Sequence, residues 1–280
     1  MRHLAVIVAR RTHRMSLVDS APIQNTAALP APPEAALDAM ALFVDVDGTM
    51  VDFAPRPDEV RVEPSVPSML RRLQIRLGGA LAPLSGRPLR EIDSLLQLPP
   101  AAAAGLHGAE FRTPDGHEIA MPIDASKLDS ARARAIAAAA ANPGVLVEDK
   151  GIAIALHYRQ AQWAKDEVGR AALDMSALAG GDFELLHGNL VIELKPRGPT
   201  KGAALAAMMH EPPFAGRTPW MIGDDLTDED AFIRANALGG VSIIVGARRP
   251  THANYALDHP AAARAWVAML ASGNSARRNA

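Results

Sequence analysis

Ala41-Leu42-Phe43-Val44-Asp45-Val46-Asp47-Gly48-Thr49 is an apolar run that ends in two carboxylates two positions apart. Along an extended chain alternate side chains point to the same side, so Asp45 and Asp47 are expected together where a buried strand ends. Gly48 lets the backbone turn away beneath them. Two crowded acids repel each other, and their natural partners are therefore a divalent cation and a phosphate.

The composition narrows the classes of protein and partner. The chain has 280 residues, enough for one large domain or two modest ones, and its formal net charge is only -2. Acids and bases are interspersed, which gives no reason to expect a nucleic acid or a membrane surface as partner. Cysteine is absent, which excludes thiol catalysis, disulfides and thiolate zinc sites. We expect small-molecule partners and a monomer or weak homodimer.

The N-terminal segment differs from the rest. Residues 1–35 are rich in arginine, then in proline and alanine, without a sustained period, and we expect a disordered tail there. An arm that binds something acidic is the alternative. The apolar run from Leu4 to Ala9 is too short for a secretion signal, and no stretch approaches the roughly 20 apolar residues of a bilayer span. A cytoplasmic location is expected.

From residue 41 the chain alternates strand and helix signals, which predicts an α/β fold with a parallel sheet and helices on both faces. We assign 36–117 and 195–273 to this Rossmann-like core. Ser85 is expected to cap, and Pro88 to open, the helix after the second strand. The strands are expected at 41–45, 80–84, 219–223 and 241–245, and further helices at 65–77, 229–237 and 261–270.

Residues 118–194 follow another pattern and are expected to form an inserted, antiparallel α+β domain. Its strand 151–159 alternates, with Ile154 and Leu156 on one face and Ala155 and His157 on the other, which predicts one wet face. The remaining elements are expected as helices at 124–141 and 162–178 and strands at 145–148, 183–186 and 190–194.

Four charged segments follow core strands, where open α/β sheets place their ligands. Each has a plain structural explanation alone, as a helix cap or solvated surface, but all four in this order indicate a phosphate and metal site. They are the Asp45/Asp47 pair, Ser85-Gly86-Arg87, Lys201 in the first turn of a helix, and the acid-rich run Gly223 to Asp230.

Electrostatics restricts what such a site does. A carboxylate that attacks a phosphate dianion is repelled by about 4 kcal/mol for each pair of unit charges at about 4 Å, so neutralisation must come first. One Mg²⁺ held by the acids, with Lys201 and Arg87 on the other phosphate oxygens, leaves Asp45 able to attack in line. Asp45 would become an aspartyl phosphate, and Asp47 would alternate as acid and base.

These four motifs resemble the signature motifs of the haloacid dehalogenase superfamily of phosphatases, and the insertion is similar to its C2 type of cap. Within that superfamily the chain resembles the trehalose-6-phosphate phosphatase family over about residues 41 to 270. The segments that carry this resemblance are Gly105-Leu-His-Gly-Ala-Glu110, Val147-Glu-Asp-Lys-Gly151, Val191-Ile-Glu-Leu-Lys-Pro196 and Gly223-Asp-Asp-Leu-Thr-Asp-Glu-Asp-Ala-Phe232.

The resemblance implies a Mg²⁺-dependent phosphoric monoester hydrolase of trehalose biosynthesis, with a role for each matching residue. Asp45 would be nucleophile and metal ligand, and Asp47 acid/base with its main-chain carbonyl on Mg²⁺. Asp224 would be the remaining protein ligand, supported by Asp225 and Asp228. The residues implied to contact the transferring phosphate are Thr49, Ser85, Gly86, Arg87 and Lys201. The residues implied to contact the sugar are Glu148, Lys150, Glu193 and His107, the last of which equally fits a packed turn.

Alternatives remain open at the level of the sequence. Lys150 could pair with Glu193 or Glu148 merely to hold the cap together. Other substrates of the same chemistry are sucrose 6-phosphate and mannosyl-phosphoglycerate, and a mutase would pass the phosphate to a sugar instead of water. A non-catalytic sugar sensor is the non-enzymatic alternative. If the protein is an enzyme, we expect the cap to close over substrate and exclude water.

Overall fold

The computed structural model describes residues 27–54, 56, 59–98 and 101–273. Its contacts divide the chain into a discontinuous core unit, Met1–Ile119 with Thr200–Ala280, and an inserted unit, Ala120–Pro199. The sequence placed the insertion at 118–194. The later end arises because the last strand of the inserted unit, β9 (Val191–Pro196), runs on past residue 194.

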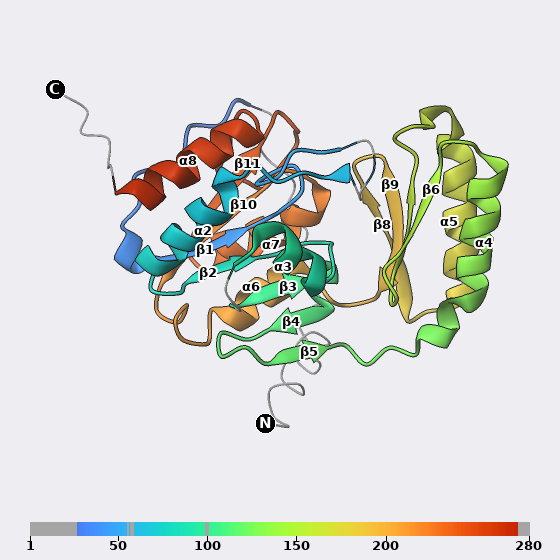
Figure 1. The fold of residues 1–280 in the computed structure, drawn as a ribbon, viewed down its shortest axis with the longest axis horizontal. Coiled ribbons are helices and arrows are strands. Elements are labelled where there is room, and N and C mark those ends of the chain that lie inside the picture. The colour runs from blue at the N-terminus through green and yellow to red at the C-terminus, as the bar shows by residue number, and fades with distance from the viewer. Residues whose placement is uncertain (1–26, 55, 57–58, 99–100, 274–280) are drawn as a thin grey trace. The chain divides into compact units, whose positions relative to one another are not determined.

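A five-stranded parallel sheet with the order β12-β11-β10-β1-β2 forms the centre of the core unit (Figure 1). Its strands are β1 (Met40–Val44), β2 (Leu81–Pro83), β10 (Thr218–Gly223), β11 (Val241–Val245) and β12 (Tyr255–Leu257). Val44 of β1 pairs with Pro83 on one side and with Ile222 on the other. The three strands therefore end together, and the acids after β1 and β10 share one edge of the sheet.

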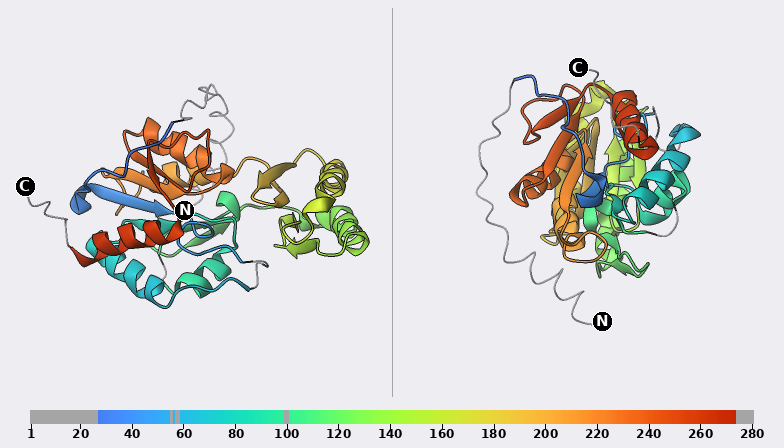
Figure 2. Two further views of the ribbon diagram at one scale, coloured as in Figure 1. Left: turned by 90° about the horizontal axis from the view of Figure 1, so that it is seen from above. Right: turned by 90° about the vertical axis from the view of Figure 1, so that its left-hand side faces the viewer.

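Helices cover both faces of this sheet (Figure 2). The helices α2, α3 and α8 lie on one face, and α6 and α7 on the other. Every residue of β1 is buried, as a central strand covered on both sides requires. The α/β core with helices on both faces is confirmed. The helices span α2 (Ser65–Arg76), α3 (Leu89–Leu96), α6 (Lys201–Met208), α7 (Glu229–Ala237) and α8 (Pro260–Ser272).

The core unit also contains short strands that the sequence analysis did not predict. Strands β3 (Ala103–Gly105), β4 (Glu110–Arg112) and β5 (Glu118–Ala120) form a small separate sheet, in which β3 and β4 are antiparallel. Each of these strands, like β12, has three residues, too few to produce a recognisable alternation.

The tail predicted for residues 1–35 was assigned too far along the chain. Residues 1–26 lie outside the described residues. Leu29 and Ala35, however, pack against the hydrophobic core, and Ala256 N donates a hydrogen bond to the carbonyl of Pro30 at 2.9 Å. Apolar side chains, and a backbone N–H donor on the edge strand β12, hold this part of the segment in place.

The inserted unit is an antiparallel sheet with the order β6-β7-β9-β8, covered on one face by two helices. Ile154, Leu156 and Leu194 point toward the helices and form its core. The elements are α4 (Asp129–Ala141), β6 (Leu146–Asp149), β7 (Ile154–His157), α5 (Lys165–Ala179), β8 (Phe183–Gly188) and β9.

The sequence predicted that the other face of β7 is wet, and this prediction was wrong at Ala155. Ala155 is fully buried, because it pairs with Glu148 on one neighbouring strand and with Glu193 on the other. Directly paired residues point to the same side of a sheet, so the longer charged side chains flank the small alanine. The face without helices is therefore a charged surface with an apolar floor.

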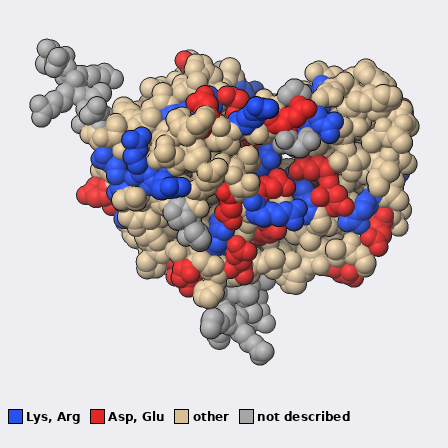
Figure 3. All heavy atoms as spheres, viewed as in Figure 1, with Lys and Arg blue, Asp and Glu red and all other residues tan. Residues whose placement is uncertain are grey.

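None of the helices in the described part of the chain combines the length and hydropathy needed to cross a membrane. Basic and acidic side chains mix over the face drawn in Figure 3.

Candidate active site

Asp45 and Lys201, 156 positions apart in the sequence, meet at the carboxyl edge of the sheet. Asp45 directly follows β1, and Lys201 is the first residue of α6. Thr200 caps the N-terminus of α6, because its side chain accepts a hydrogen bond from Ala203 N. Lys201 Nζ donates to Asp45 Oδ1 at 2.6 Å and to Asp228 Oδ1 at 2.8 Å. Helix dipoles disfavour a cation in the first turn, and the two carboxylates remove this conflict.

A third acid, Asp224 at the end of β10, completes a cluster around this pair. Asp45, Asp224 and Asp228 each offer an oxygen, and these oxygens lie within 4.8 Å of one another. When all these groups are ionised, the three carboxylates and Lys201 have a net charge of −2, which one divalent cation would balance. The cluster is therefore a candidate metal centre.

Burial perturbs the protonation of these groups. It raises the pKa of Asp45 to about 8, against the opposing effect of Lys201. Burial and the neighbouring Asp45 and Asp228 raise the pKa of Asp224 to about 10. Burial alone would lower the pKa of Lys201, but Asp228 and Asp45 raise it well above the usual value. Perturbation of this kind is typical of functional sites.

Asp228 organises the loop after β10 from a fully buried position. Its Oδ2 accepts from the backbone N–H of Asp224 at 2.9 Å and of Asp225 at 3.1 Å, while Oδ1 accepts from Lys201. A Cβ on Gly223 would lie 2.3 Å from Asp228 Cγ, so only glycine fits there. With both oxygens engaged, Asp228 is placed to hold Asp224 and Lys201 in position.

Asp225 and Thr49 make contacts in the structure that the sequence did not predict. Asp225, grouped there with the metal residues, instead caps the short helix Leu226–Asp228, and its Oδ1 accepts from Thr227 N and Oγ1. This Asx-type cap is a local alternative that acids adopt readily. Thr49, expected on the phosphate, donates to Asp224 Oδ1 at 3.4 Å.

Asp47 and Arg87 form a bidentate pair. Arg87 Nε and Nη2 donate to the two oxygens of Asp47, each at 2.7 Å, and Nη1 donates to Glu91 Oε2 at 3.2 Å. The sequence analysis placed this guanidinium on the phosphate. Ser85 is buried, but it does not cap α3. Its Oγ accepts from Arg87 N at 3.1 Å, and the N-cap position belongs to Pro88.

His107 lies beside Gly86, as a packed turn requires. A Cβ on Gly86 would lie 2.6 Å from His107 Nε2, and His107 itself has a positive φ of 57°. The predicted residues of the core unit, from Asp45 to Asp228, thus gather around the carboxyl ends of β1, β2 and β10.

In the inserted unit Glu148, Lys150 and Glu193 also come together. Lys150 Nζ lies 2.7 Å from Glu193 Oε2 and 3.9 Å from Glu148 Oε2, so the ion pairs weighed as the structural alternative are formed. Burial alone would raise the pKa of Glu148, but the hydrogen bond from His157 and the charge of Lys150 hold this pKa below its usual value.

Two residues that contact the predicted site residues were not found from the sequence. His157 contacts Glu148 Oε2 at 2.7 Å, and strand pairing would have revealed this proximity. Arg248, in the loop after β11, donates to the backbone carbonyls of Asp224 and Asp225, both at 3.3 Å, and contacts Glu229. Nothing in the local sequence signals that contact.

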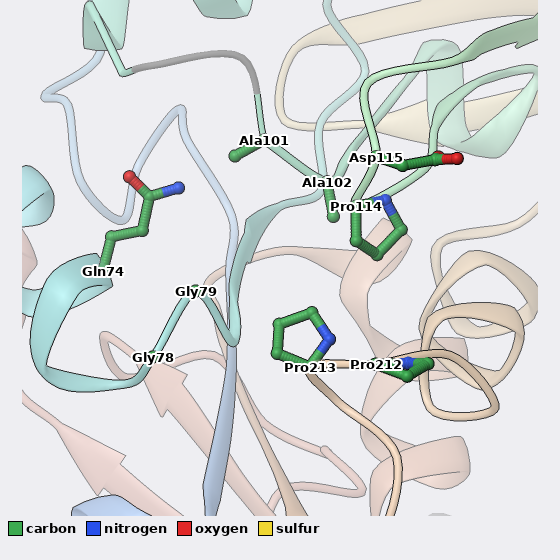
Figure 4. Close-up of a pocket in the computed structure, with 9 residues that line it drawn as sticks. All are labelled: Gln74, Gly78, Gly79, Ala101, Ala102, Pro114, Asp115, Pro212 and Pro213. Carbon is green, nitrogen blue, oxygen red and sulfur yellow. The ribbon is translucent and has the colours of Figure 1, made fainter.

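A pocket of about 500 Å³ lies at the other edge of the core sheet (Figure 4). Gly78 and Gly79, before β2, and Pro212 and Pro213, before β10, are among its lining residues. These segments lie before the amino ends of β2 and β10, whereas the acid cluster follows the carboxyl ends of β1 and β10. The pocket is therefore separate from the acid cluster.

The amino-acid sequence is similar to those of known phosphatases. A family model described as trehalose-phosphatase matches residues 43–261. The chain is similar to a probable trehalose-phosphate phosphatase of Sinorhizobium fredii, with 44% identity over 84% of this chain and 88% of the relative. It is also similar to the trehalose-6-phosphate phosphatase of Escherichia coli, with 38% identity over 85% of this chain and 89% of the relative.

The fold is shared with solved structures at lower identity. The C-terminal domain of the C. albicans trehalose-6-phosphate phosphatase superposes with a TM-score of 0.77 at 19% identity, over 89% of this chain and 99% of that domain. The fold is also shared with BT1666 of Bacteroides thetaiotaomicron, described as a phosphatase of the haloalkanoate (HAD) enzyme superfamily, with a TM-score of 0.51 at 16% identity over 86% of this chain and 98% of that chain. The fold that the motifs predicted is therefore confirmed. Both the family model and the identity to curated relatives over most of the chain lead to one conclusion: this protein belongs to the trehalose-phosphatase family and is a phosphatase.

Proposed function

We propose that the protein hydrolyses trehalose 6-phosphate to trehalose and phosphate, the substrate in the name of its Escherichia coli relative. One observation carries the proposal: Lys201 is buried between Asp45 and Asp228, with Asp224 beside them. A buried cation among acids, at the carboxyl edge of a parallel sheet, suits a phosphate and its counter-ion. A cytoplasmic location and a monomeric or weakly dimeric state stay predictions from the sequence.

The acid cluster fits Mg²⁺, which prefers carboxylate and carbonyl oxygens and balances the excess charge of the three acids. Asp45, Asp224 and the main-chain carbonyl of Asp47 would hold the ion, with Asp225 and Asp228 behind them. Bound there, it would supply charge neutralisation between Asp45 and the phosphate.

The proposed reaction has two displacements at phosphorus. Asp45 attacks, an Asp45 oxygen–phosphorus bond forms, and the ester phosphorus–oxygen bond breaks as Asp47 gives its proton to the leaving sugar oxygen. Asp47 then takes a proton from water, the water oxygen bonds to phosphorus, and the aspartyl bond breaks to release phosphate and free Asp45. Lys201 stabilises charge on the phosphate oxygens throughout.

Arg87 has a position that such a cycle would use. In the structure its guanidinium holds both oxygens of Asp47. We expect a phosphate dianion to draw the guanidinium partly away from Asp47, because Arg binds phosphate as readily as carboxylate. Asp47 would then be free to carry the proton, with the Ser85 hydroxyl and the amides of Gly86 and Thr49 close to the phosphate.

The sugar is proposed to bind the charged surface of the inserted unit. Glu148, Lys150 and Glu193 are mostly buried, and buried charges need polar partners. Sugar hydroxyls are both donors and acceptors, so they match carboxylate and ammonium groups alike. His107 is a further candidate contact from the core unit.

Phosphate release from a panel of sugar phosphates tests the proposal. We expect trehalose 6-phosphate to be hydrolysed faster than sucrose 6-phosphate, mannosyl-phosphoglycerate or glucose 6-phosphate, and EDTA to abolish turnover until Mg²⁺ is restored. Asp45→Asn should fold but release no phosphate. Full hydrolysis by Asp45→Asn would exclude the covalent scheme, and a preference for another member of the panel would reassign the substrate.

A further inference from the structure

The segment that carries Ser85 and Arg87 does little to hold itself in place. Residues 85–88 lie between β2 and α3, and Pro88, the N-cap of α3, makes no side-chain cap bond. The hydrogen bond from Arg87 N to Ser85 Oγ at 3.1 Å is a contact within the segment itself. Yet Arg87 must be placed well, because two of its nitrogens meet the two oxygens of Asp47.

Ser85 N donates to Ala104 O on β3 at 2.9 Å, and a second segment, 105–110, adds three further hydrogen bonds. Leu106 N donates to Arg87 O at 3.0 Å, and His107 N donates to Ser85 O at 3.0 Å. Glu110 lies on β4, and its Oε2 accepts a hydrogen bond at 2.7 Å from the backbone N–H of Leu89, the first residue of α3. A carboxylate at a helix N-terminus is favoured by the helix dipole and forms a charge-assisted hydrogen bond.

The approach of the two segments is close and needs special backbone geometry. A Cβ on Gly105 would lie 2.8 Å from both Arg87 O and Leu89 N, so only glycine fits. Leu106 and His107 have φ values of 47° and 57°, a left-handed conformation that residues with a Cβ rarely adopt. Strained backbone at such a site persists only where the surroundings enforce it.

We propose that Glu110 is a positioning residue for phosphoryl transfer: by capping α3 it fixes the 85–88 segment, and with it Arg87 against Asp47. The inference rests on the proposed function insofar as Arg87 and Asp47 serve the reaction there. It adds a role for a carboxylate that touches neither the acid cluster nor Asp47 in any contact described above.

A double-mutant cycle on kcat tests whether Glu110 acts through Arg87. We expect Glu110→Ala to lower kcat about tenfold or more with little change in KM, because small displacements of reacting groups cost that much. Glu110→Gln, which keeps an acceptor oxygen, should recover most of the loss. Arg87→Ala should lower kcat strongly, and adding Glu110→Ala to it should cause little further loss, since coupled residues are not additive.

Asp124→Ala is the matched control, because Asp124 Oδ1 caps the short helix Ala125–Leu128 in the same way, by accepting from Ser126 N at 3.1 Å. It should leave kcat unchanged. Melting temperatures of all variants identify any loss of fold. Equal fractional losses from Glu110→Ala in the wild-type and Arg87→Ala backgrounds would overturn the proposal. So would unchanged kcat in Glu110→Ala, or in Arg87→Ala.

p-Nitrophenyl phosphate separates this inference from the proposed substrate. All variants are measured on it and on trehalose 6-phosphate, and Glu110 should affect kcat on both alike, because its role concerns the phosphate group. If the wild-type protein hydrolyses p-nitrophenyl phosphate but not trehalose 6-phosphate, the proposed substrate is wrong and the cycle on p-nitrophenyl phosphate still decides the role of Glu110.

Discussion

Lys201 has two carboxylate partners, Asp45 and Asp228, and this arrangement sets the charge balance of the site. Burial makes ionised carboxylates costly, so without a further cation the third acid, Asp224, favours its protonated form, and its pKa is raised. A metal ion and protons therefore compete for the same oxygens.

That competition predicts how magnesium and pH act together on stability. In the folded chain the pKa of Asp45 is raised to about 8 from 3.8, so between these values the folded state binds more protons than the unfolded state. The free energy of unfolding without metal should fall as pH rises through this window. Mg²⁺ needs ionised carboxylates, and it should raise the melting temperature more at about pH 8 than at about pH 6.

Thermal unfolding with and without Mg²⁺ across this pH range is the measurement. Asp45→Asn removes one of the titrating groups and should make the metal-free pH dependence in the same window less steep, and the raised pKa of Asp224 accounts for part of the slope that remains. A magnesium-induced shift that stays constant from about pH 6 to about pH 8, or shrinks, would contradict the prediction.

Glu193 tests the charged surface of the inserted unit. If it binds the sugar, Glu193→Ala should raise KM for trehalose 6-phosphate about tenfold, the effect of losing a hydrogen bond to a charged group, and leave p-nitrophenyl phosphate hydrolysis unchanged. Asp149→Ala is the control, because Asp149 lies on the helix-covered face of the same sheet and pairs with Arg132. If Glu193→Ala impairs both substrates equally, its pair with Lys150 only holds the unit together.

The loop after β1 is the element on which the acid cluster depends. Gly48 has a φ of +85°, and a Cβ there would lie 2.4 Å from Asp224 Oδ2. Gly48→Ala should therefore displace Asp224, weaken Mg²⁺ binding and lower kcat at least tenfold. Isothermal titration with Mg²⁺ and kcat on p-nitrophenyl phosphate are the measurements.

Gly116→Ala separates this steric effect from backbone strain. Gly116 has nearly the same φ, +87°, but no atom lies within 4 Å of a Cβ built there. Both substitutions incur the cost of a left-handed residue, about 1–2 kcal/mol, and only Gly48→Ala should affect Mg²⁺ and turnover. Similar losses from the two variants would mean that strain, and not the approach of Asp224, explains the effect.

The elements show which features a sequence reveals. The helices α2, α7 and α8 and the strands β1, β10 and β11 follow from period and apolar runs, and the four motifs located the acids because each comes at a strand or helix end. β3, β4, β5 and β12 were missed, since three residues show no period. The cap of α3 was misassigned because its partner, Glu110, lies 21 positions away. Long-range partners leave no local pattern.

At the scale of the whole molecule the chain passes between the two units twice, at 119–120 and at 199–200. The second connection is short: Glu193 on β9 and Lys201 on α6 are eight positions apart. Lys195 Nζ fastens this segment by donating to the carbonyls of Pro196 at 3.2 Å and Pro199 at 3.0 Å. Residues proposed for the sugar and the phosphate are thus joined by a stretch of chain with little slack.

A ligand that engages both units should therefore draw them together and exclude water from the reacting phosphate. Small-angle scattering of the Asp45→Asn variant, which should bind without turnover, is the measurement. Saturating trehalose 6-phosphate with Mg²⁺ should reduce the radius of gyration, and inorganic phosphate with Mg²⁺ should not, because it lacks the sugar. Adding Glu193→Ala should abolish the contraction at the same ligand concentration. An unchanged radius of gyration at saturation would contradict the predicted closure.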